Sequence, residues 1–536
     1  MSTEDLGKYL NTANLKNAAL HFRTYGFRSM FRKTIDYVES TRNYDKWIRS
    51  HIPSKELLEQ QKNHTFSYQP KISIIVPVYK TPAVFLKQMI DSVINQTYPD
   101  WELCIADGSA DPSCAYLKEL VQTYQKQYPN ILYSYLPENY GISGNTNAAL
   151  SLATGEFIAL LDHDDALTPD ALFEIAAALN TDPGIDVLYS DEDKTTTDFR
   201  SFYNPYFKPD FNLDLLRSCN YITHFFVVRK QIVDMIGGFS TECDGSQDYD
   251  FILKSCERAS HIYHIPKILY HWRIHPASVA GDPESKTYAY RSAVNALQNH
   301  LIRCGENGTV SKAEQFGYYK INYAFSGSPL VSIVLFRCSA HLQEQIQSIS
   351  TYKNIEFVSS HEKSKGRFLI FLHHVKKILT PDWIEQLLGN CSRPSSGLVS
   401  AKSFYKKGKI LEYGLVFSCD GQLHSPFYKF NEWDTGYCYH AKTQRDCSMV
   451  SPYCIMIRTD LLEKYFDNLV SDHFVQNIYH LCHTLNFNKL SVVLLPDVAV
   501  LCNETKQSLP VLDFCSGKND PYYNPNFSDK KIYHLS

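Results

Sequence analysis

Apolar stretches alternate with helical ones from residue 71 onward, and this alternation restricts the fold more than any other feature. The segments KISIIVPVY, WELCIADGS, ILYSYLP and EFIALLDHDD are rich in aliphatic and aromatic residues, as buried strands are. The segments between them, among them PAVFLKQMIDSVINQ and CAYLKELVQTYQKQY, have the apolar spacing of helices. Strands and helices in this order predict an α/β fold with a mostly parallel sheet and helices on both faces.

Acidic residues follow two of the predicted strands. Asp107 ends one strand, and Asp162, Asp164 and Asp165 follow another. Ligands of such sheets bind at the carboxyl ends of the strands, so we expect these acids to meet at one solvent-facing edge. Carboxylates this close repel one another unless a cation lies among them, and oxygen ligands suit Mg²⁺ or Mn²⁺. The alternative is a turn that caps the next helix at Thr168, but a cap needs one acid rather than three.

Other sequence features narrow the class of protein. The first strand is not followed by G-x-G-x-x-G, and no G-x-x-x-x-G-K-[ST] occurs, which argues against dehydrogenase-type and P-loop nucleotide sites. The formal net charge of −4 gives no reason to expect a nucleic-acid partner. The 15 cysteines have no CxxC pair and no secretory signal precedes them, so we expect free thiols and a cytoplasmic location. No apolar run reaches the roughly 18 to 20 residues that span a bilayer.

The first 68 residues have a helical pattern. Between residues 15 and 32, basic side chains alternate with apolar ones, namely Lys16, Arg23, Arg28 and Arg32 with Leu20, Phe22, Phe27, Met30 and Phe31. A basic amphipathic helix of this kind can lie on an anionic membrane surface. The alternative is a helix that packs on the next domain and leaves its basic face in solvent. Peripheral attachment to the inner face of the cell membrane is therefore a hypothesis.

The second half of the chain repeats the first. SIIV at 73 corresponds to SIVL at 332, and GEFIALLDHDDALTPD at 155 to GRFLIFLHHVKKILTPD at 366. FFVVRKQIVDMIGGF at 225 is similar to YCIMIRTDLLEKYF at 453, and HIPKILYHW to LLPDVAVLC. We therefore predict a helical leader (1–68), a first α/β domain (69–325), a second, degenerate copy of it (326–505) and a C-terminal tail (506–536).

The motifs of residues 71 to about 282 resemble family 2 glycosyltransferases with the Rossmann-like GT-A fold. SIIVPVY resembles the opening strand of that family, IADGS its base-reading aspartate, LDHDD its D-x-D motif, and GGF with DGSQDYDF its catalytic-base motif. HIPKILYHWRIHPAS resembles its closing segment, and YSDEDK and FKPDF narrow the likeness to a bacterial branch that builds surface polysaccharides with tandem modules. Several short motifs in the right order make the match specific.

The resemblance implies roles for individual residues. Asp248 would be the catalytic base, although Gln247 stands where the family often has Glu, and the alternative is an acid that opens a helix. The metal would be held by Asp164, Asp165 and His271. The donor-binding residues would be Pro77, Tyr79, Asp107, Asn139, Gly141, Asn145, Asp162, Arg273 and His275. The acceptor side would use Asp191, Glu192, Asp193 and Trp272, where a solvated acidic loop and a core tryptophan are the alternatives.

The acidic residues predict a Mn²⁺ or Mg²⁺ site, and the resemblance implies a metal-dependent, inverting glycosyltransferase. It would move a hexosyl or deoxyhexosyl group from a UDP- or dTDP-sugar to a growing polysaccharide or lipid-linked glycan. The alternatives are a non-catalytic scaffold or glycan-binding protein, and a nucleotidyltransferase of similar fold. In the second copy, LHHVK places His373, His374, Val375 and Lys376 at the acidic positions, VSAKS answers to YSDE, and Leu501 to His271. Only Asp472 offers a loose counterpart of the base, so we predict a non-catalytic copy.

Overall fold

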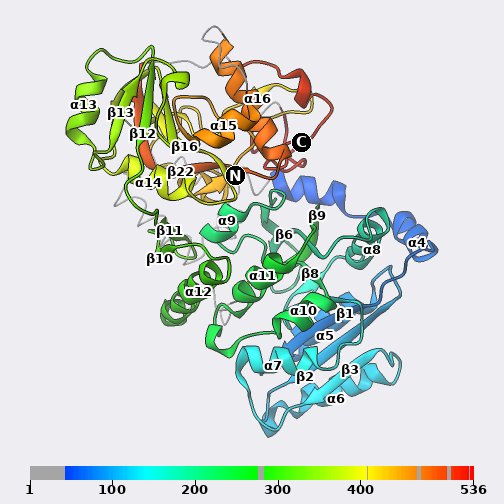
Figure 1. Ribbon diagram of the computed structural model, residues 1–536. Coiled ribbons are helices and arrows are strands. Elements are labelled where there is room, and N and C mark those ends of the chain that lie inside the picture. The colour runs from blue at the N-terminus through cyan, green and yellow to red at the C-terminus, as the bar shows by residue number, and fades with distance from the viewer. Residues whose placement is uncertain (1–42, 276–282, 407, 467–472, 504–508, 530–531) are drawn as a thin grey trace, which may run out of the picture.

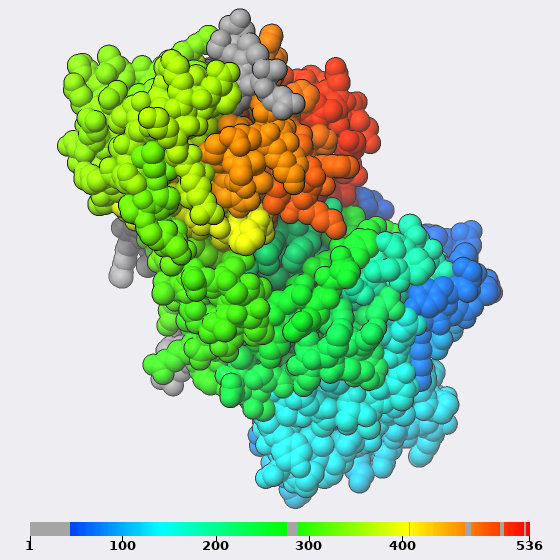
Figure 2. Space-filling model, in the orientation of Figure 1, coloured from blue at the N-terminus to red at the C-terminus, as the bar shows by residue number. Residues whose placement is uncertain are grey.

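Two α/β units make up the protein. The computed structural model describes residues 43–275, 283–406, 408–466, 473–503, 509–529 and 532–536, and each unit is built around a nine-stranded sheet (Figure 1). In the space-filling view the two units press against each other, and the cyan part of the first unit lies farthest from the second (Figure 2). Among the described residues, no helix combines the length and the apolar character that a membrane crossing requires.

The first sheet has the strand order β3-β2-β1-β4-β8-β6-β9-β5, with β7 beside β6. Strands β1 to β4 that pair do so in parallel, β8 runs antiparallel to both β4 and β6, and β6 is parallel to β9. The strands are β1 Ile72–Val78, β2 Trp101–Asp107, β3 Ile131–Tyr135, β4 Phe157–Leu160, β5 Ala166–Leu167, β6 Val187–Thr195, β7 Phe202–Tyr206, β8 Phe226–Arg229 and β9 Ile262–Arg273.

Helices cover both faces of this sheet, as the sequence predicts. Side chains alternate along β1, so that Ile74 packs into one core and Ile75 into the other. All seven residues of β1 and of β2 are buried, which explains their uninterrupted apolar character. The helices of this unit are α5 Ala83–Ile94, α6 Ala115–Gln125, α7 Gly141–Leu150, α8 Ala171–Thr181, α9 Leu213–Ser218, α10 Lys230–Ile236, α11 Gln247–Arg258 and α12 Pro283–Arg303.

The second sheet repeats the first. Its order is β13-β12-β14-β21-β16-β22-β15, with β17 beside β16, and each pair has the same direction as its counterpart in β2-β1-β4-β8-β6-β9-β5. The second sheet has no counterpart of β3. A hairpin, β10 Gly308–Lys312 and β11 Tyr319–Tyr323, precedes it. Its strands are β12 Val331–Phe336, β13 Ile355–Val358, β14 Phe368–His373, β15 Val375–Ile378, β16 Ser396–Lys406, β17 Lys409–Glu412, β20 Arg445–Asp446, β21 Cys454–Arg458 and β22 Ser491–Cys502.

One buried polar arrangement occurs in both sheets. Ser73 donates to Glu102 at 2.6 Å and accepts from the N–H of Gly155 at 2.8 Å. Ser332, Glu356 and Gly366 repeat this arrangement at 2.6 and 2.9 Å. A Cβ on either glycine would lie 2.6 or 2.7 Å from the serine oxygen, so only glycine fits. The repeat therefore keeps residues that the fold needs.

Segments from both ends of the chain close over the junction of the units. A helix over residues 43–51 places Tyr44 and Trp47 against Phe207, and the C-terminal segment adds Tyr523 and Phe527 to the same cluster. The described part of the N-terminal region is helical as predicted, with α4 Lys55–Lys62 following the helix over residues 43–51. The basic segment 15–32 lies outside the described residues. The helices of the second unit are α13 Leu342–Ile349, α14 Trp383–Cys391, α15 Thr459–Tyr465 and α16 Phe474–Phe487.

Candidate active site

The carboxyl edge of the first sheet brings together residues from β1 and β2. Asp107 ends β2 and is buried, and its carboxylate accepts from the N–H of Ser109 and from the Tyr133 hydroxyl, each at 2.8 Å. Pro77 pairs with Ala106 on the adjacent strand, while the side chain of Tyr79 is exposed just beyond. Pro77 and Tyr79, which are predicted to bind the donor, therefore lie on the strand next to Asp107 and just beyond its end.

A turn before α7 holds three more of the predicted donor-binding residues. The side-chain oxygen of Asn139 accepts from the N–H of Gly141 at 3.1 Å and from the amide of Asn145 at 2.9 Å. Gly141 has φ +75°, and a Cβ there would lie 2.9 Å from the Asp244 carboxylate. The three residues thus fix the start of α7 beside the loop that leads into α11.

The three aspartates after β4 differ in their surroundings. The Asp162 side chain is 55% exposed. The Asp164 carboxylate lies 2.8 Å from the ring of His275. Asp165 is buried, with its carboxylate accepting from the Tyr270 hydroxyl at 2.6 Å and the N–H of Arg273 at 2.7 Å. The prediction that these acids face solvent is therefore wrong for Asp165, because residues of β9 cover its side chain.

Arg273 holds the loop of Asp162, Asp164 and Asp165 in place through hydrogen bonds. Its buried guanidinium donates to the backbone oxygen of Asp164 at 2.5 Å and to the side chain of Gln88 at 2.6 Å, and it lies over the rings of Phe85 and Phe199. Burial lowers the pKa of Arg273 to about 10, which leaves the group charged at neutral pH. Its role in donor binding stays a prediction, and its visible contacts hold the acidic loop.

His224 is the residue that the sequence did not reveal. Its ring lies 3.6 Å from the Asp162 carboxylate and 3.4 Å from that of Glu192, and it stacks on Tyr270. Burial lowers the pKa of His224, but the two carboxylates outweigh that effect and raise it well above the ordinary value. Ala159 of β4 pairs with Val227 of β8. Asp162 lies three residues after Ala159 and His224 three residues before Val227, so the antiparallel pairing brings the two side chains to the same end of the strands. His224 is therefore found from the antiparallel pairing of β8 with β4, which the structure shows.

Asp162, Asp165 and His224 have the donor atoms of a cation site. One ligand atom from each lies within 4.8 Å of the others. Burial, together with the charges of Asp164 and Asp162, raises the pKa of Asp165 well above its ordinary value. A cation would relieve this repulsion, and carboxylate oxygens with one imidazole fit Mn²⁺ or Mg²⁺.

His271, which the sequence assigns to the metal, has other neighbours. Its ring lies 2.6 Å from the Asp193 carboxylate and against Phe202. Its role as a metal ligand stays a prediction. Trp272 is partly buried, with the Lys194 ammonium 4.8 Å from its ring and His224 at 5.6 Å.

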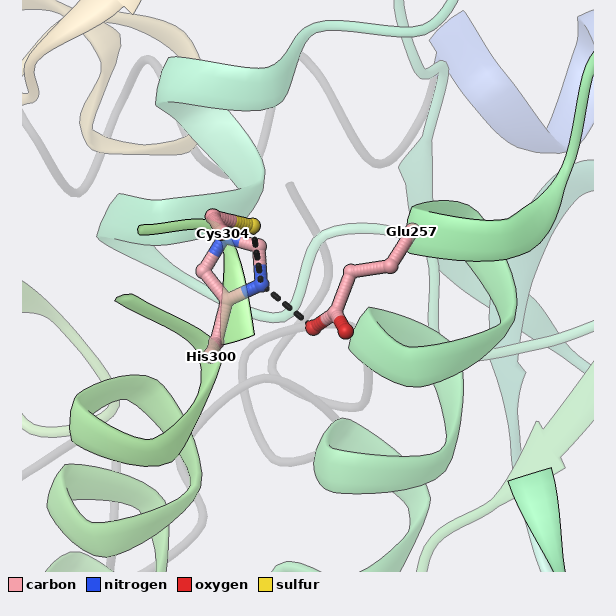
Figure 3. Close-up of side chains that lie close together, drawn as sticks. All are labelled: Glu257, His300 and Cys304. Atoms are coloured by element: carbon pink, nitrogen blue, oxygen red, sulfur yellow. Dashed lines mark hydrogen bonds and ion pairs between the residues drawn. The ribbon is translucent and has the colours of Figure 1, made fainter. Parts of the chain in front are cut away.

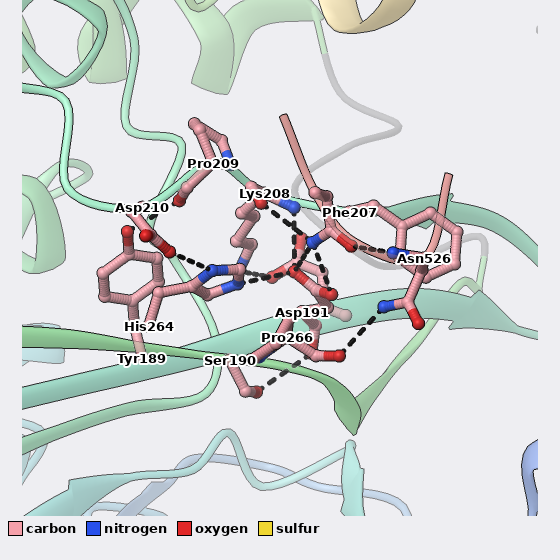
Figure 4. Close-up of polar contacts among 12 residues, drawn as sticks. Tyr189, Ser190, Asp191, Phe207, Lys208, Pro209, Asp210, His264, Pro266 and Asn526 are labelled. Carbon is pink, nitrogen blue, oxygen red and sulfur yellow. Dashed lines mark hydrogen bonds and ion pairs between the residues drawn. The ribbon is translucent and has the colours of Figure 1, made fainter. Parts of the chain in front are cut away.

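The acids of YSDEDK do not form a solvated loop. They lie in β6 and are buried. Asp191 accepts from the N–H of Lys208 at 2.8 Å, contacts His264 at 2.9 Å and accepts from the side chain of Asn524 (Figure 4). Glu192 pairs with the Lys208 ammonium at 3.1 Å. These contacts make the acids part of the wall of the site, and a direct role toward an acceptor stays a prediction.

Asp248 lies in the first turn of α11, where its carboxylate accepts from the side-chain amide of Asn220 at 3.0 Å. Burial raises the pKa of Asp248 above its ordinary value, and the charges of His224 and Asp162 also act on it. Asp248 therefore opens a helix, and its role as the catalytic base stays a prediction.

A second cluster of possible ligands lies elsewhere among the described residues. Glu257, His300 and Cys304 converge between α11 and α12 (Figure 3). Two guanidinium groups lie against this cluster. Arg303 donates to Glu257 at 2.6 Å, and Arg217 donates to His300 at 3.0 Å. Two fixed positive charges disfavour a cation, so this cluster is a structural network.

In the described part of the second unit, other residue types stand at the acidic positions. Burial lowers the pKa of His373, at the position of Asp162, to about 4. Leu188 pairs with Val227 as Val399 pairs with Met456, so Ala401 stands at the position of Ser190 and Lys402 at that of Asp191. The sequence pairing of YSDE with VSAKS is thus displaced by one residue. Asp472 lies outside the described residues.

The chain is similar to several known proteins. Residues 73–237 match the model of glycosyl transferase family 2. The chain is 30% identical over 445 residues, 74% of its length and 48% of the relative, to the uncharacterized protein y4gI of Sinorhizobium fredii. It is 27% identical over 552 residues, 91% of its length and 43% of the relative, to the O-antigen biosynthesis protein RfbC of Myxococcus xanthus.

The chain thus spans less than half the length of these two relatives. Among solved structures, S. aureus TarS 1–349 in complex with UDP-GlcNAc aligns with 43% of this chain and 66% of that chain, at 20% identity and a TM-score of 0.37.

Proposed function

We propose, from the membership of residues 73–237 in glycosyltransferase family 2, that the protein transfers a hexosyl or deoxyhexosyl group from a nucleotide-diphosphate sugar to a hydroxyl of a glycan. The observation that carries the proposal is the convergence of Asp162, Asp165 and His224 at the carboxyl edge. Asn220, four residues before His224, donates to Asp248 at 3.0 Å. The resemblance to family 2 glycosyltransferases supports a transfer that inverts the anomeric centre, with one carboxylate as the base.

Asp162, Asp165 and His224 would hold Mn²⁺ or Mg²⁺, with Asp164 as a further oxygen donor. A bound divalent ion neutralises the charge that develops on the leaving diphosphate. Asp107 would accept from the imide N–H of uracil or thymine, and the exposed ring of Tyr79 would lie against the base. These contacts favour a UDP- or dTDP-linked donor.

Asp248 would take the proton from the acceptor hydroxyl. Burial raises the pKa of Asp248, which improves a carboxylate as a base near neutral pH. The hydrogen bond from Asn220 at 3.0 Å orients one of its oxygens and leaves the other for the acceptor.

The acceptor would be a growing cell-surface polysaccharide or a lipid-linked glycan, which agrees with the relative named for O-antigen biosynthesis. A cytoplasmic protein attached to the inner face of the membrane through residues 15–32 would meet such acceptors. The second unit would not catalyse transfer, because His373 and Lys402 replace acids there.

The test is a screen of UDP- and dTDP-sugars with the full chain, with Mn²⁺ or EDTA, reading donor hydrolysis and thermal stabilisation. We expect one or a few donors to stabilise the protein and be hydrolysed only with metal. Stabilisation by glycans without any donor hydrolysis would instead support a binding protein. Release of pyrophosphate from a nucleoside triphosphate would support a nucleotidyltransferase.

A further inference from the structure

Residues 212–224, named here the bridging segment, run from the contact with the second unit to the candidate active site. At the first end, the Asn212 amide donates to the backbone oxygen of Asp446 at 2.9 Å and its oxygen accepts from the Asp446 N–H at 3.0 Å. The same Asn212 oxygen accepts from the N–H of Leu215 and so caps α9. The start of α9 is therefore fixed on β20 of the second unit.

An ion pair strengthens this anchor. Arg393 binds Asp214 with both terminal nitrogens, at 2.9 and 3.0 Å, and both residues are nearly inaccessible to solvent. The Gln444 amide donates to the same carboxylate at 2.7 Å, and the Ser218 hydroxyl donates to the backbone oxygen of Gln444 at 2.9 Å. A bidentate, buried pair fixes geometry as well as distance. Both ends of α9 are thus held by residues of the second unit.

The other end of the bridging segment holds the reacting groups. Asn220 donates to Asp248 at 3.0 Å. The Thr223 hydroxyl and the N–H of His224 donate to Glu192, at 2.9 and 3.2 Å. The ammonium of Lys208 donates to the backbone oxygen of Ile222 at 2.7 Å. The base and the imidazole of the cation site therefore both depend on where residues 220–224 lie.

The middle of the segment has little freedom to absorb a displacement. Leu215 and Leu216 are fully buried, and the Tyr249 hydroxyl, next to Asp248 on α11, donates to the backbone oxygen of Leu216. Arg217 binds Glu306 at 2.9 Å on the far side. Close-packed elements move as units, so a shift at Asp214 is passed on to Asn220.

We propose that the second unit serves the reaction by positioning Asp248 and His224 through the bridging segment, with Asn220 as the positioning residue of the base. The inference rests on the proposed transferase function. It gives the degenerate unit a role that needs no ligand of its own. It also explains why the unit keeps its fold without its acids, because α9 needs a rigid partner. Small misplacements of a base are costly, since its geometry determines proton transfer.

The primary variant is Gln444→Ala, with Arg393→Lys as the second, since removing one partner of a buried ion pair destabilises strongly. We expect kcat to fall about tenfold in Gln444→Ala, with donor KM within about twofold. The matched control is Lys320→Gln, which breaks a 2.8 Å ion pair to Asp497 at the same junction but away from the bridging segment. The control should keep the wild-type kcat.

A double-mutant cycle distinguishes a specific effect of Gln444 on the position of Asn220 from a general loss of rigidity in the protein. If Gln444 acts through Asn220, the Gln444→Ala, Asn220→Ala double variant loses much less kcat than the product of the two single effects. Multiplicative losses, or a parallel loss of donor binding, would overturn the inference.

Hydrogen exchange gives a readout that does not depend on activity. Peptides covering residues 219–225 should exchange faster in Gln444→Ala and in Arg393→Lys than in wild type or Lys320→Gln. Unchanged exchange in folded variants would overturn the positioning role. Faster exchange in the two variants, combined with a wild-type chain that hydrolyses no donor, would leave the coupling intact and refute the transferase function instead.

Discussion

Single residues decide the chemistry at the carboxyl edge of the first sheet. Asp162, Asp164 and Asp165 lie within four residues of one another in the sequence, yet one is exposed, one contacts His275 and one is buried under β9. His224 lies opposite Asp162 because β8 runs antiparallel to β4. The site therefore joins a local acidic loop to an imidazole that lies more than sixty residues away in the chain.

Asp248→Asn tests the base. The amide keeps the size of the carboxylate but cannot take a proton, so we expect kcat to fall about 10²–10⁴-fold while donor binding persists. Single-turnover kinetics and donor titration measure the two effects. Asp234→Asn, an exposed acid on α10, is the control. Near-normal turnover in Asp248→Asn would mean that another carboxylate is the base.

His224→Phe tests the cation site. Phenylalanine keeps the stacking on Tyr270 but has no ligand atom, so we expect Mn²⁺ affinity to fall roughly 10–100-fold. Calorimetric titration of Mn²⁺ checks this, with the exposed His261→Phe as control. An unchanged affinity for Mn²⁺ would remove His224 from the ligand set.

At the scale of elements, α9 and β20 share a buried pair of acids. The N–H of Asp214 lies 3.4 Å from the Asp446 carboxylate. Burial and the charge of Asp214 raise the pKa of Asp446 well above its ordinary value, whereas Arg393 keeps Asp214 ionised despite burial. The contact between the two units thus favours the neutral form of Asp446 and the charged form of Asp214.

Asp446→Asn tests this arrangement through pH. A carboxyl whose pKa is raised by folding stabilises the protein at low pH, and that contribution is lost as the pH rises toward the raised value. We therefore expect the variant to melt above wild type at pH 8 and to lose this advantage at pH 4, because asparagine cannot ionise. Thermal melts at both pH values provide the measurement. An equal difference at both would contradict the neutral form of Asp446.

The whole molecule contains two copies of one fold, and the two copies differ in their acidic residues. From β2 to β5 the first sheet shares strand order and direction with the second, and both have the serine–glutamate–glycine arrangement. Among the described residues, the acids after β4 and in β6 have counterparts of other types in the second unit. In the second, the ammonium of Lys402 donates to the backbone oxygen of Ala441, and burial lowers the pKa of Lys402 to about 7. A lysine at an aspartate position does not favour a cation there.

Donor stoichiometry tests the inequality of the units. We expect calorimetry of the full chain to find about one nucleotide-sugar site, and none in the Asp164→Ala, Asp165→Ala double variant. Asp165 is buried and hydrogen-bonded, so the melting temperature of that variant should fall while Asp164→Ala alone leaves it nearly unchanged. Metal-dependent donor binding that survives in the folded double variant would assign a site to the second unit.

Vesicle flotation tests the membrane hypothesis. The basic and apolar residues of segment 15–32 should bind the chain to anionic vesicles at low salt, with release at high salt because the attraction is screened. Neutral vesicles are the control. A chain that stays unbound at low salt would refute peripheral attachment.

The sequence by itself determined the strands, the helices, the duplication and the acidic loop. These features are local, since apolar periodicity reports burial and a strand-end acid reports the edge. Asp107, Asp162 and Asp164 lie at the predicted edge for that reason. The domain boundaries and the roles of the site residues stay predictions.

The tertiary structure alone decided which distant groups meet. No spacing in the sequence places β8 beside β4, so His224 was not found. Nor does any spacing predict that Asn524 reaches Asp191, or Tyr44 reaches Asp193, across 333 and 149 residues. Asp165 was expected at a solvent-facing edge, and a solvated loop was the alternative for the acids of β6, yet other elements bury all of them. The physical reason is that burial and charge pairing depend on packing between elements, which local sequence does not specify.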